Sequence, residues 1–124
     1  AEAESAIAEL AGQSEGVVLI AALRTMLEIN IDAARDLSIQ ALDHNDTEVV
    51  KAAIEILMHI DDSWLDEQSD RLLSHELWDI RSIFIKALAE HRGANALPIL
   101  KTALARETDY FVRRQIMDLL GEFS

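Results

Sequence analysis

Two stretches of this chain decide its fold: LDHNDTEVVKAAIEIL, from Leu42 to Leu57, and LARETDYFVRRQIMDLL, from Leu104 to Leu120. In each stretch the first leucine is followed eight residues later by a β-branched residue that opens an apolar run. We call this second residue the marker. The leucine–marker pairs of the whole chain are Leu10/Val18, Leu42/Val50, Leu72/Ile80 and Leu104/Val112. The markers lie 32, 30 and 32 residues apart, and self-similarity at such a period is typical of a solenoid.

Apolar residues follow each marker at the spacing of an amphipathic helix. Four residues after the markers stand Ala22, Ile54, Phe84 and Ile116, and eight residues after them stand Met26, Met58, Leu88 and Leu120. The pattern predicts helices over 2–11, 15–28, 31–42, 47–60, 64–73, 77–91, 96–106 and 109–123. N-caps are expected at Ser14, Asn30, Thr47, Ser63, Asn95 and Thr108. No alternating strand pattern is present, so the predicted fold class is all-α.

The two quoted stretches resemble HEAT repeats, in which an acidic or polar turn leads to a valine–arginine or valine–lysine step at the start of the second helix. Here the step reads Val50-Lys51, Ile80-Arg81 and Val112-Arg113. The resemblance covers essentially the whole chain and is clearest from residue 34 onward. Two features depart from it: Val18 is followed by Leu19, and the third turn, SHELWD, lacks the usual Asp-rich sequence.

This resemblance implies a right-handed α-solenoid of four antiparallel helix pairs, about eight helices, in a single domain over 1–124. The expected repeats are approximately 1–29, 30–61, 62–92 and 93–124. Repeats this short are similar to those of bacterial HEAT arrays, and we expect the domain to be excised from a larger protein. Residues 17–23, within the helix predicted over 15–28, are apolar on all sides, which favours further repeats or self-association at the N-terminal end.

Charge is unevenly distributed along the chain, whose formal net charge is -12. Residues 1–70 carry sixteen acidic side chains against three basic ones, a balance of -13, and residues 71–124 carry seven against eight, a balance of +1. Such acidity disfavours nucleic acid and anionic membranes as partners. The chain has no cysteine, so neither a disulfide nor a thiolate metal site is expected, and a cytoplasmic setting is consistent with this composition.

Candidate partner-binding residues follow from the resemblance, which places the second helix of each pair on the concave face. Two residues before the markers stand Trp78 and Tyr110, which we expect side by side on adjacent repeats. Basic residues on the same helices are Lys51, Arg81, Lys86, Arg113 and Arg114. Aromatic residues interleaved with arginine have the composition of a protein-binding hot spot. The alternative is structural: the rings fill the turns between repeats, and the charges form a ladder of ion pairs.

The sequence shows no pattern of catalytic or cofactor-binding residues. His44, His59, His75 and His91 do not occupy equivalent positions when counted from the repeat leucines and markers, so we interpret them as surface residues and expect no metal site. The methionines are interpreted as core residues. With no phosphate loop or nucleophile elbow, we expect no cofactor and no enzymatic activity. A protein-interaction or scaffolding module is the leading hypothesis. The alternatives are a structural or regulatory spacer and, disfavoured, a HEAT-like enzyme such as a phycobilin lyase or DNA glycosylase.

Overall fold

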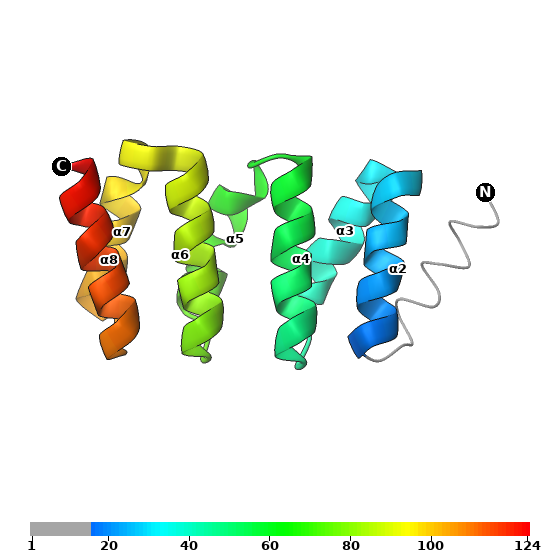
Figure 1. Cartoon of the computed structure of the whole chain (residues 1–124), viewed down its shortest axis with the longest axis horizontal. Helices are drawn as coiled ribbons and strands as arrows, with labels where there is room; N and C mark the ends of the chain where they lie inside the picture. The colour runs from blue at the N-terminus through cyan, green and yellow to red at the C-terminus, as the bar shows by residue number, and fades with distance from the viewer. Residues whose placement is uncertain (1–15) are drawn as a thin grey trace. The chain divides into compact units, whose positions relative to one another are not determined.

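The computed structural model describes residues 16–124, which form seven α-helices and one 3-10 helix, without a strand among them (Figure 1). The α-helices are α2 (Gly16–Ile29), α3 (Ile31–Ala41), α4 (Thr47–Ile60), α5 (Trp64–Leu73), α6 (Trp78–Arg92), α7 (Leu97–Arg106) and α8 (Tyr110–Phe123), with η1 at Gly93–Ala96. The all-α prediction is confirmed, and each of these α-helices ends within one residue of its predicted bounds. The helix predicted over 2–11 and the N-cap predicted at Ser14 lie outside the described residues.

These helices fall into two compact units, whose boundary lies between residues 62 and 63. The first unit contains α2, α3 and α4, and the second contains α5, α6, α7 and α8. The boundary is one residue from the one predicted between the second and third repeats. None of the helices within residues 16–124 has the length and apolarity required to cross a lipid bilayer.

In the first unit, α2 and α4 lie side by side and both pack against α3 (Figure 1). Their shared core contains Leu23 and Met26 from α2 and Ile54 and Leu57 from α4, all fully buried. Ala34 of α3 is also fully buried, and its small side chain allows close approach of the neighbouring helices. An exposed ion pair, Arg24 with Glu55, joins α2 to α4.

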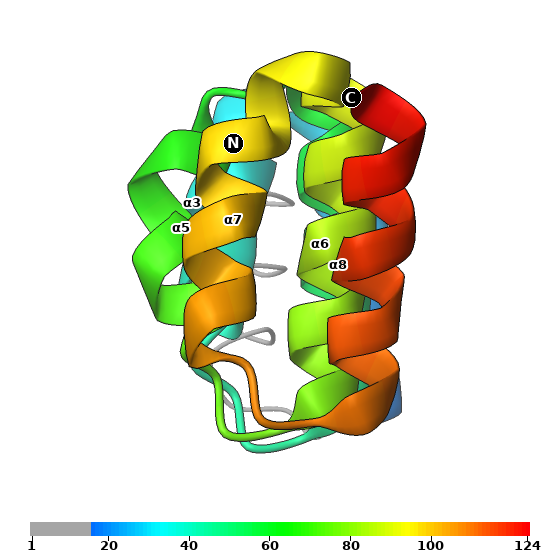
Figure 2. The same cartoon turned by 90° about the vertical axis from the view of Figure 1, so that its left-hand side faces the viewer.

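The second unit consists of two helix pairs in two layers, with α5 and α7 in one layer and α6 and α8 in the other (Figure 2). Trp64 of α5 packs edge-on against Phe84 of α6, with ring centroids 5.8 Å apart, and both rings are buried. Two large rings of this kind each remove about 150–250 Å² from water, so they dominate the core of this unit. Ser82 of α6 and Gln115 of α8 exchange two hydrogen bonds, which join the second helices of the two pairs.

The apolar register predicted from the markers is confirmed at three of the four markers and along the whole i+4 row. It is confirmed in part along the i+8 row, where Met26 and Leu88 are buried and Met58 and Leu120 are half-buried. Val50, Ile80 and Val112 are buried, and all four residues of the i+4 row are buried as well. Val18 is 49% exposed, because Leu19 occupies the inward-facing position at the start of α2. The first buried position of α2 is therefore one residue later than predicted, and the later positions of the buried stripe are as predicted.

Two of the five N-caps predicted within the described residues, Asn30 and Ser63, stand at the N-cap positions of their helices, and of these two Asn30 makes the expected side-chain bond. Asn30 is confirmed, since its Oδ1 accepts the Ala33 N–H at 3.1 Å. The caps of α4 and α8 are Asp46 and Asp109 rather than the adjacent threonines, because the aspartate oxygens accept the N–H groups of Glu48 and Val112. Ser63 precedes α5 without a side-chain capping bond, and Asn95 lies inside η1.

Gly93 ends α6 and allows the chain to enter η1. Its φ of 53° and ψ of -131° lie in a region that side chains with a Cβ rarely adopt. Pro98 then stands in the first turn of α7, where its missing N–H leaves no helical hydrogen bond unmade. Together they turn the chain from the first pair of the second unit into the next.

Candidate functional site

Three exposed aromatic rings lie together in the second unit, where Phe111 contacts both of the others, and we call Trp78, Tyr110 and Phe111 the aromatic cluster. The Trp78 and Phe111 ring centroids are 6.2 Å apart, and those of Tyr110 and Phe111 are 5.7 Å apart with perpendicular rings. Trp78 is 50% exposed, and Tyr110 and Phe111 are each 69% exposed. Three large rings that remain in solvent after folding are available to be buried by another molecule.

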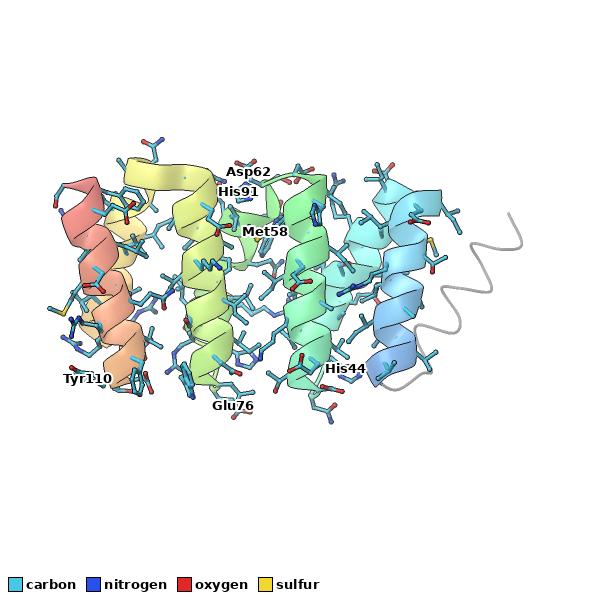
Figure 3. The ribbon with its side chains drawn as sticks, viewed as in Figure 1. His44, Met58, Asp62, Glu76, His91 and Tyr110 are labelled. Atoms are coloured by element: carbon cyan, nitrogen blue, oxygen red, sulfur yellow. The ribbon has the colours of Figure 1, made fainter. Side chains whose placement is uncertain are left out.

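The helix starts position this cluster. Trp78 is the first residue of α6, and Tyr110 and Phe111 are the first two residues of α8. Because α6 packs against α8, their first turns bring the rings together. Figure 3 shows Tyr110 at the end of α8 where the helix begins. The sequence predicts Trp78 beside Tyr110, but Phe111 lies between them. The tandem Tyr110-Phe111 just before the marker was the signal for this third ring.

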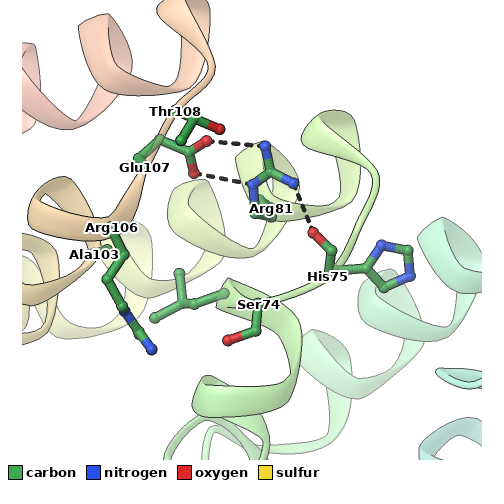
Figure 4. A pocket seen from close by; sticks show the side chains of 8 residues that line it. Ser74, His75, Arg81, Ala103, Arg106, Glu107 and Thr108 are labelled. Atoms are coloured by element: carbon green, nitrogen blue, oxygen red, sulfur yellow. Dashed lines mark hydrogen bonds and ion pairs between the residues drawn. The ribbon is translucent and has the colours of Figure 1, made fainter.

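Arg81 faces the interior of the second unit instead of a partner. Its Nε and Nη2 donate to the two carboxylate oxygens of Glu107, both at 2.9 Å, and its Nη1 donates to the His75 carbonyl oxygen at 2.6 Å (Figure 4). The Arg81 side chain is 13% exposed and that of Glu107 is 5% exposed. This bidentate pair joins α6 to the turn before α8, so Arg81 acts as one step of the ion-pair ladder considered as the structural alternative.

Arg113 shares half of this arrangement. Like Arg81, it follows a marker, and its Nη1 donates to the carbonyl oxygen six residues earlier, here that of Glu107 at 2.9 Å. The same nitrogen also donates to the Leu104 carbonyl oxygen. Lys51, which follows the second marker, forms an ion pair with Glu48 within the same helix. The basic residue after the marker thus stabilises the preceding turn in the third and fourth repeats.

The remaining predicted basic residues lie on exposed parts of the same helices. Arg114 forms an exposed ion pair with Asp118 at 3.6 Å within α8. Lys86 is exposed on α6 and lines a surface pocket of about 350 Å³ that also contains Leu119 and Phe123 of α8. Neither residue lies in the helix turns that carry the aromatic cluster.

Two histidines have a structural role that their spacing from the leucines concealed. His44 Nδ1 accepts the Asp46 N–H at 2.9 Å, and His75 Nδ1 accepts the Leu77 N–H at 3.1 Å. Glu107 Oε1 accepts the Asp109 N–H in the same way at 3.0 Å. In each case the N–H belongs to the N-cap residue of the next helix, and the acceptor stands two residues before that N-cap. The three acceptors therefore occupy equivalent positions when they are counted back from the N-caps. The count from the leucines and markers does not reveal this equivalence of His44 and His75.

The turns of the second unit enclose a polar pocket of about 240 Å³, drawn in Figure 4. Ser74, His75 and Glu107 line it, together with Arg106 and Thr108. Both Glu107 oxygens are bonded to Arg81, and His75 Nδ1 is bonded to the backbone. Glu107 is thus unable to orient His75 as a base toward Ser74, as hydrolytic chemistry would require. The polar side chains here hold the turns together.

Metal-ligand types do not gather within residues 16–124, where no group of three or more histidine, aspartate or glutamate side chains is arranged to hold an ion. Of the methionines interpreted as core residues, Met26 is buried, Met58 is half-buried, and Met117 is 52% exposed on α8. The prediction was wrong for Met117, because it lies on the side of α8 away from α6 and α7.

The rings of the aromatic cluster remain exposed after folding, whereas His75 and Glu107 of the pocket are hydrogen-bonded within the fold. We therefore take the aromatic cluster as the candidate functional site of the described chain. Comparison of the sequence with models of protein families, with curated proteins and with solved structures found no match.

Proposed function

We propose that this chain is a non-enzymatic protein-interaction module that binds its partner through the aromatic cluster on α6 and α8. The observation that carries the proposal is the contact of Phe111 with both Trp78 and Tyr110, which makes one group of three exposed rings. Tryptophan and tyrosine are enriched among the residues that contribute most to protein-protein affinity, because their large surfaces lose little conformational freedom on binding.

We also propose that the helix pairs form a HEAT-like, right-handed α-solenoid, with the second helix of each pair on its concave side. The fourfold repetition of the leucine–marker spacing supports this arrangement. Within the second unit, support comes from the packing of α6 against α8 and from the placement of α5 and α7 together in the other layer. In such an array the aromatic cluster lies at one edge of the second-helix row, where two neighbouring repeats contribute to one binding surface.

Contacts within the cluster favour binding, because they hold the rings before a partner arrives. Each ring–ring contact contributes about 0.5–1.5 kcal/mol beyond area burial and limits the side-chain freedom that is lost on association. Leu77, the N-cap residue of α6, is 39% exposed and extends the apolar surface next to Trp78. Arg81 is not part of this surface, since its guanidinium is occupied by Glu107 and the His75 carbonyl.

The proposal is tested by affinity capture from a cell lysate with the wild-type chain and a Trp78→Ala/Phe111→Ala variant, followed by mass spectrometry. A matched control is Ile31→Ala, which removes an exposed apolar side chain from α3 in the first unit. We expect a protein that is retained by the wild type and the control and lost by the double variant. All three must first show equal helical circular dichroism.

Two results contradict the proposal. One is a set of captured proteins that the double variant retains as well as the wild type does. The other is the absence of any protein enriched over a blank matrix, which favours a structural or regulatory spacer. Because the substituted rings are exposed, loss of capture with retained helicity is attributable to the surface and not to unfolding.

A further inference from the structure

Two rows of side chains line the boundary between α6 and α8, which lie side by side and begin at the same end (Figures 1 and 2). The members of each row recur at intervals of four or seven residues, which places them on one side of a helix. The rows are Trp78, Ser82 and Ala89 on α6, and Phe111, Gln115 and Leu119 on α8. We call these six residues the α6–α8 seam. It starts at the aromatic cluster and follows both helices toward their C-terminal ends.

Direct contacts join the two rows in the first half of the seam. At its start the rings of Trp78 and Phe111 meet, with centroids 6.2 Å apart. One turn later, Ser82 Oγ donates to Gln115 Oε1 at 2.8 Å, and Gln115 Nε2 donates to the Ser82 carbonyl oxygen at 3.0 Å. These contacts hold α6 and α8 at a fixed offset, so the seam is formed before any partner binds.

The second half of the seam opens into a surface pocket of about 350 Å³. Ala89 and Leu119, both half-buried, supply apolar lining from the two helices, and half-buried Phe123 extends it at the end of α8. Gln115 also lines the pocket, so the pocket adjoins the hydrogen-bonded part of the seam. The aromatic cluster is thus one end of a longer surface, and an apolar pocket is the other end.

The middle of the seam offers few hydrogen-bonding groups to a bound segment, because the Ser82 hydroxyl and the Gln115 amide bond each other. An extended segment along the seam would place part of its own backbone against these side chains and against the apolar pocket. Its N–H and C=O groups there would lose water without gaining partners, which costs free energy. A helix satisfies its backbone groups internally except at its ends. The seam therefore favours a helical occupant.

We infer that the occupant of the aromatic cluster is an amphipathic helix of the partner protein, which lies along the α6–α8 seam and contributes an apolar side chain at each end. This inference rests on the proposed function and adds the class and length of the partner segment. From Trp78 to Ala89 the axis of α6 advances roughly 16 Å, at about 1.5 Å per residue. A partner helix aligned with α6 covers this length in about eleven residues, so its apolar side chains recur at i, i+4, i+7 and i+11. One end packs on Trp78 and Phe111, and the other enters the pocket beside Leu119.

The experiment selects peptides on the immobilised full chain from a phage-displayed library of random sequences of about 16 residues, enough for four helical turns. A random library favours neither helical nor extended binders in advance. We expect the enriched sequences to carry apolar residues at the helical spacing given above. A synthetic copy of an enriched peptide should gain helical circular dichroism when the chain is added.

Variants at the two ends of the seam locate the bound peptide, whose affinity is measured by fluorescence anisotropy. Trp78→Ala at the cluster and Leu119→Gln at the pocket should each weaken binding roughly tenfold. Phe123→Ala, in the last turn of α8, is a second variant of the pocket end and keeps the test independent of the folding of Leu119→Gln. The matched control is Met117→Gln, which removes a 52% exposed apolar side chain from the side of α8 away from α6 and should leave the affinity unchanged. All variants must first show the helical circular dichroism of the wild type.

Three results would overturn the inference: no enriched peptide, enriched peptides whose apolar residues alternate as in a strand, and binding that depends on Trp78 but on neither Leu119 nor Phe123. The outcome is separable from that of the proposed function. If lysate capture still identifies a partner that depends on Trp78 and Phe111, the interaction module stands and only the helical occupant of the seam is wrong. If an enriched helical peptide depends on both ends of the seam, both proposals gain support from independent measurements.

Discussion

Arg81 and Arg113 occupy the same place in two successive repeats and differ in what they contact. Each donates to the carbonyl oxygen six residues earlier, in the turn before its helix. Within the described residues, only Arg81 also meets a buried carboxylate, that of Glu107, which belongs to the turn before the next second helix. For these two arginines, the same position in the repeat gives the same contact with the backbone. The side-chain partner depends instead on the residues that the neighbouring repeat supplies.

Removal of Arg81 should destabilise the second unit strongly. In an Arg81→Leu variant the Glu107 carboxylate, 5% exposed, would remain without its counterion, and we expect a loss of about 3–5 kcal/mol in the free energy of unfolding. An Arg81→Leu/Glu107→Leu variant should recover most of this loss, because no uncompensated charge stays buried. Urea unfolding followed by tryptophan fluorescence measures the effect, since Trp64 and Trp78 both lie in the second unit.

The control for this prediction is Arg114→Leu, which breaks an exposed ion pair in the same unit. Exposed pairs contribute up to about 1 kcal/mol. If Arg81→Leu costs no more than Arg114→Leu, the bidentate pair does not have the structural role described above.

At the scale of the helix, the start of α8 is determined by two consecutive side-chain hydrogen bonds. Glu107 Oε1 accepts the Asp109 N–H, and Asp109 Oδ1 accepts the Val112 N–H, both at 3.0 Å. The second bond satisfies one of the donors that every helix leaves free in its first turn. Because Tyr110 and Phe111 lie between these partners, the same bonds fix the backbone that carries two rings of the aromatic cluster.

An Asp109→Ala substitution should cost about 1 kcal/mol of stability, because Val112 N–H loses its acceptor. Thr108→Ala, one residue earlier and exposed, should change stability by less than about 0.5 kcal/mol. Urea midpoints of the two variants, recorded by tryptophan fluorescence, decide between Asp109 and Thr108 as the cap. A larger effect at Thr108 would show that Thr108, the residue predicted from the sequence, is the N-cap of α8.

At the scale of the whole molecule, the two units differ in charge as well as in helix content. The first unit over its described residues, 16–62, contains nine acidic and three basic side chains, a balance of -6. The second, over 63–124, contains ten acidic and eight basic ones, a balance of -2. The candidate site therefore lies in the less strongly charged of the two units.

If all repeats form one solenoid, as we propose, destabilisation should spread from one unit to the other, because adjacent repeats stabilise each other. Arg81→Leu should then increase amide hydrogen exchange in α4, within the first unit, as well as in α6. Exchange measured residue by residue tests this directly. Unchanged protection of α4 beside lost protection of α6 would show that the units unfold independently and would contradict a single cooperative array.

The local sequence pattern predicts the positions of the helices in residues 16–124 and most of the buried stripe. Both properties depend on neighbours three or four residues apart, and the 3.6-residue period records these directly. Ala22, Ile54, Phe84 and Ile116 were therefore placed in the core correctly. The third repeat follows the same rule although its turn departs from the HEAT pattern.

Which side chains remain available at the candidate site depends instead on how the helices pack. Arg81 was withdrawn from the site by Glu107, 26 residues away, and Phe111 was added to it by contact with Trp78 on another helix. These outcomes depend on the angle and offset at which α6 packs against α8, which no local pattern encodes. A repeat period shows that two helices are neighbours, but only their packing shows which side chains meet between them and which stay in solvent.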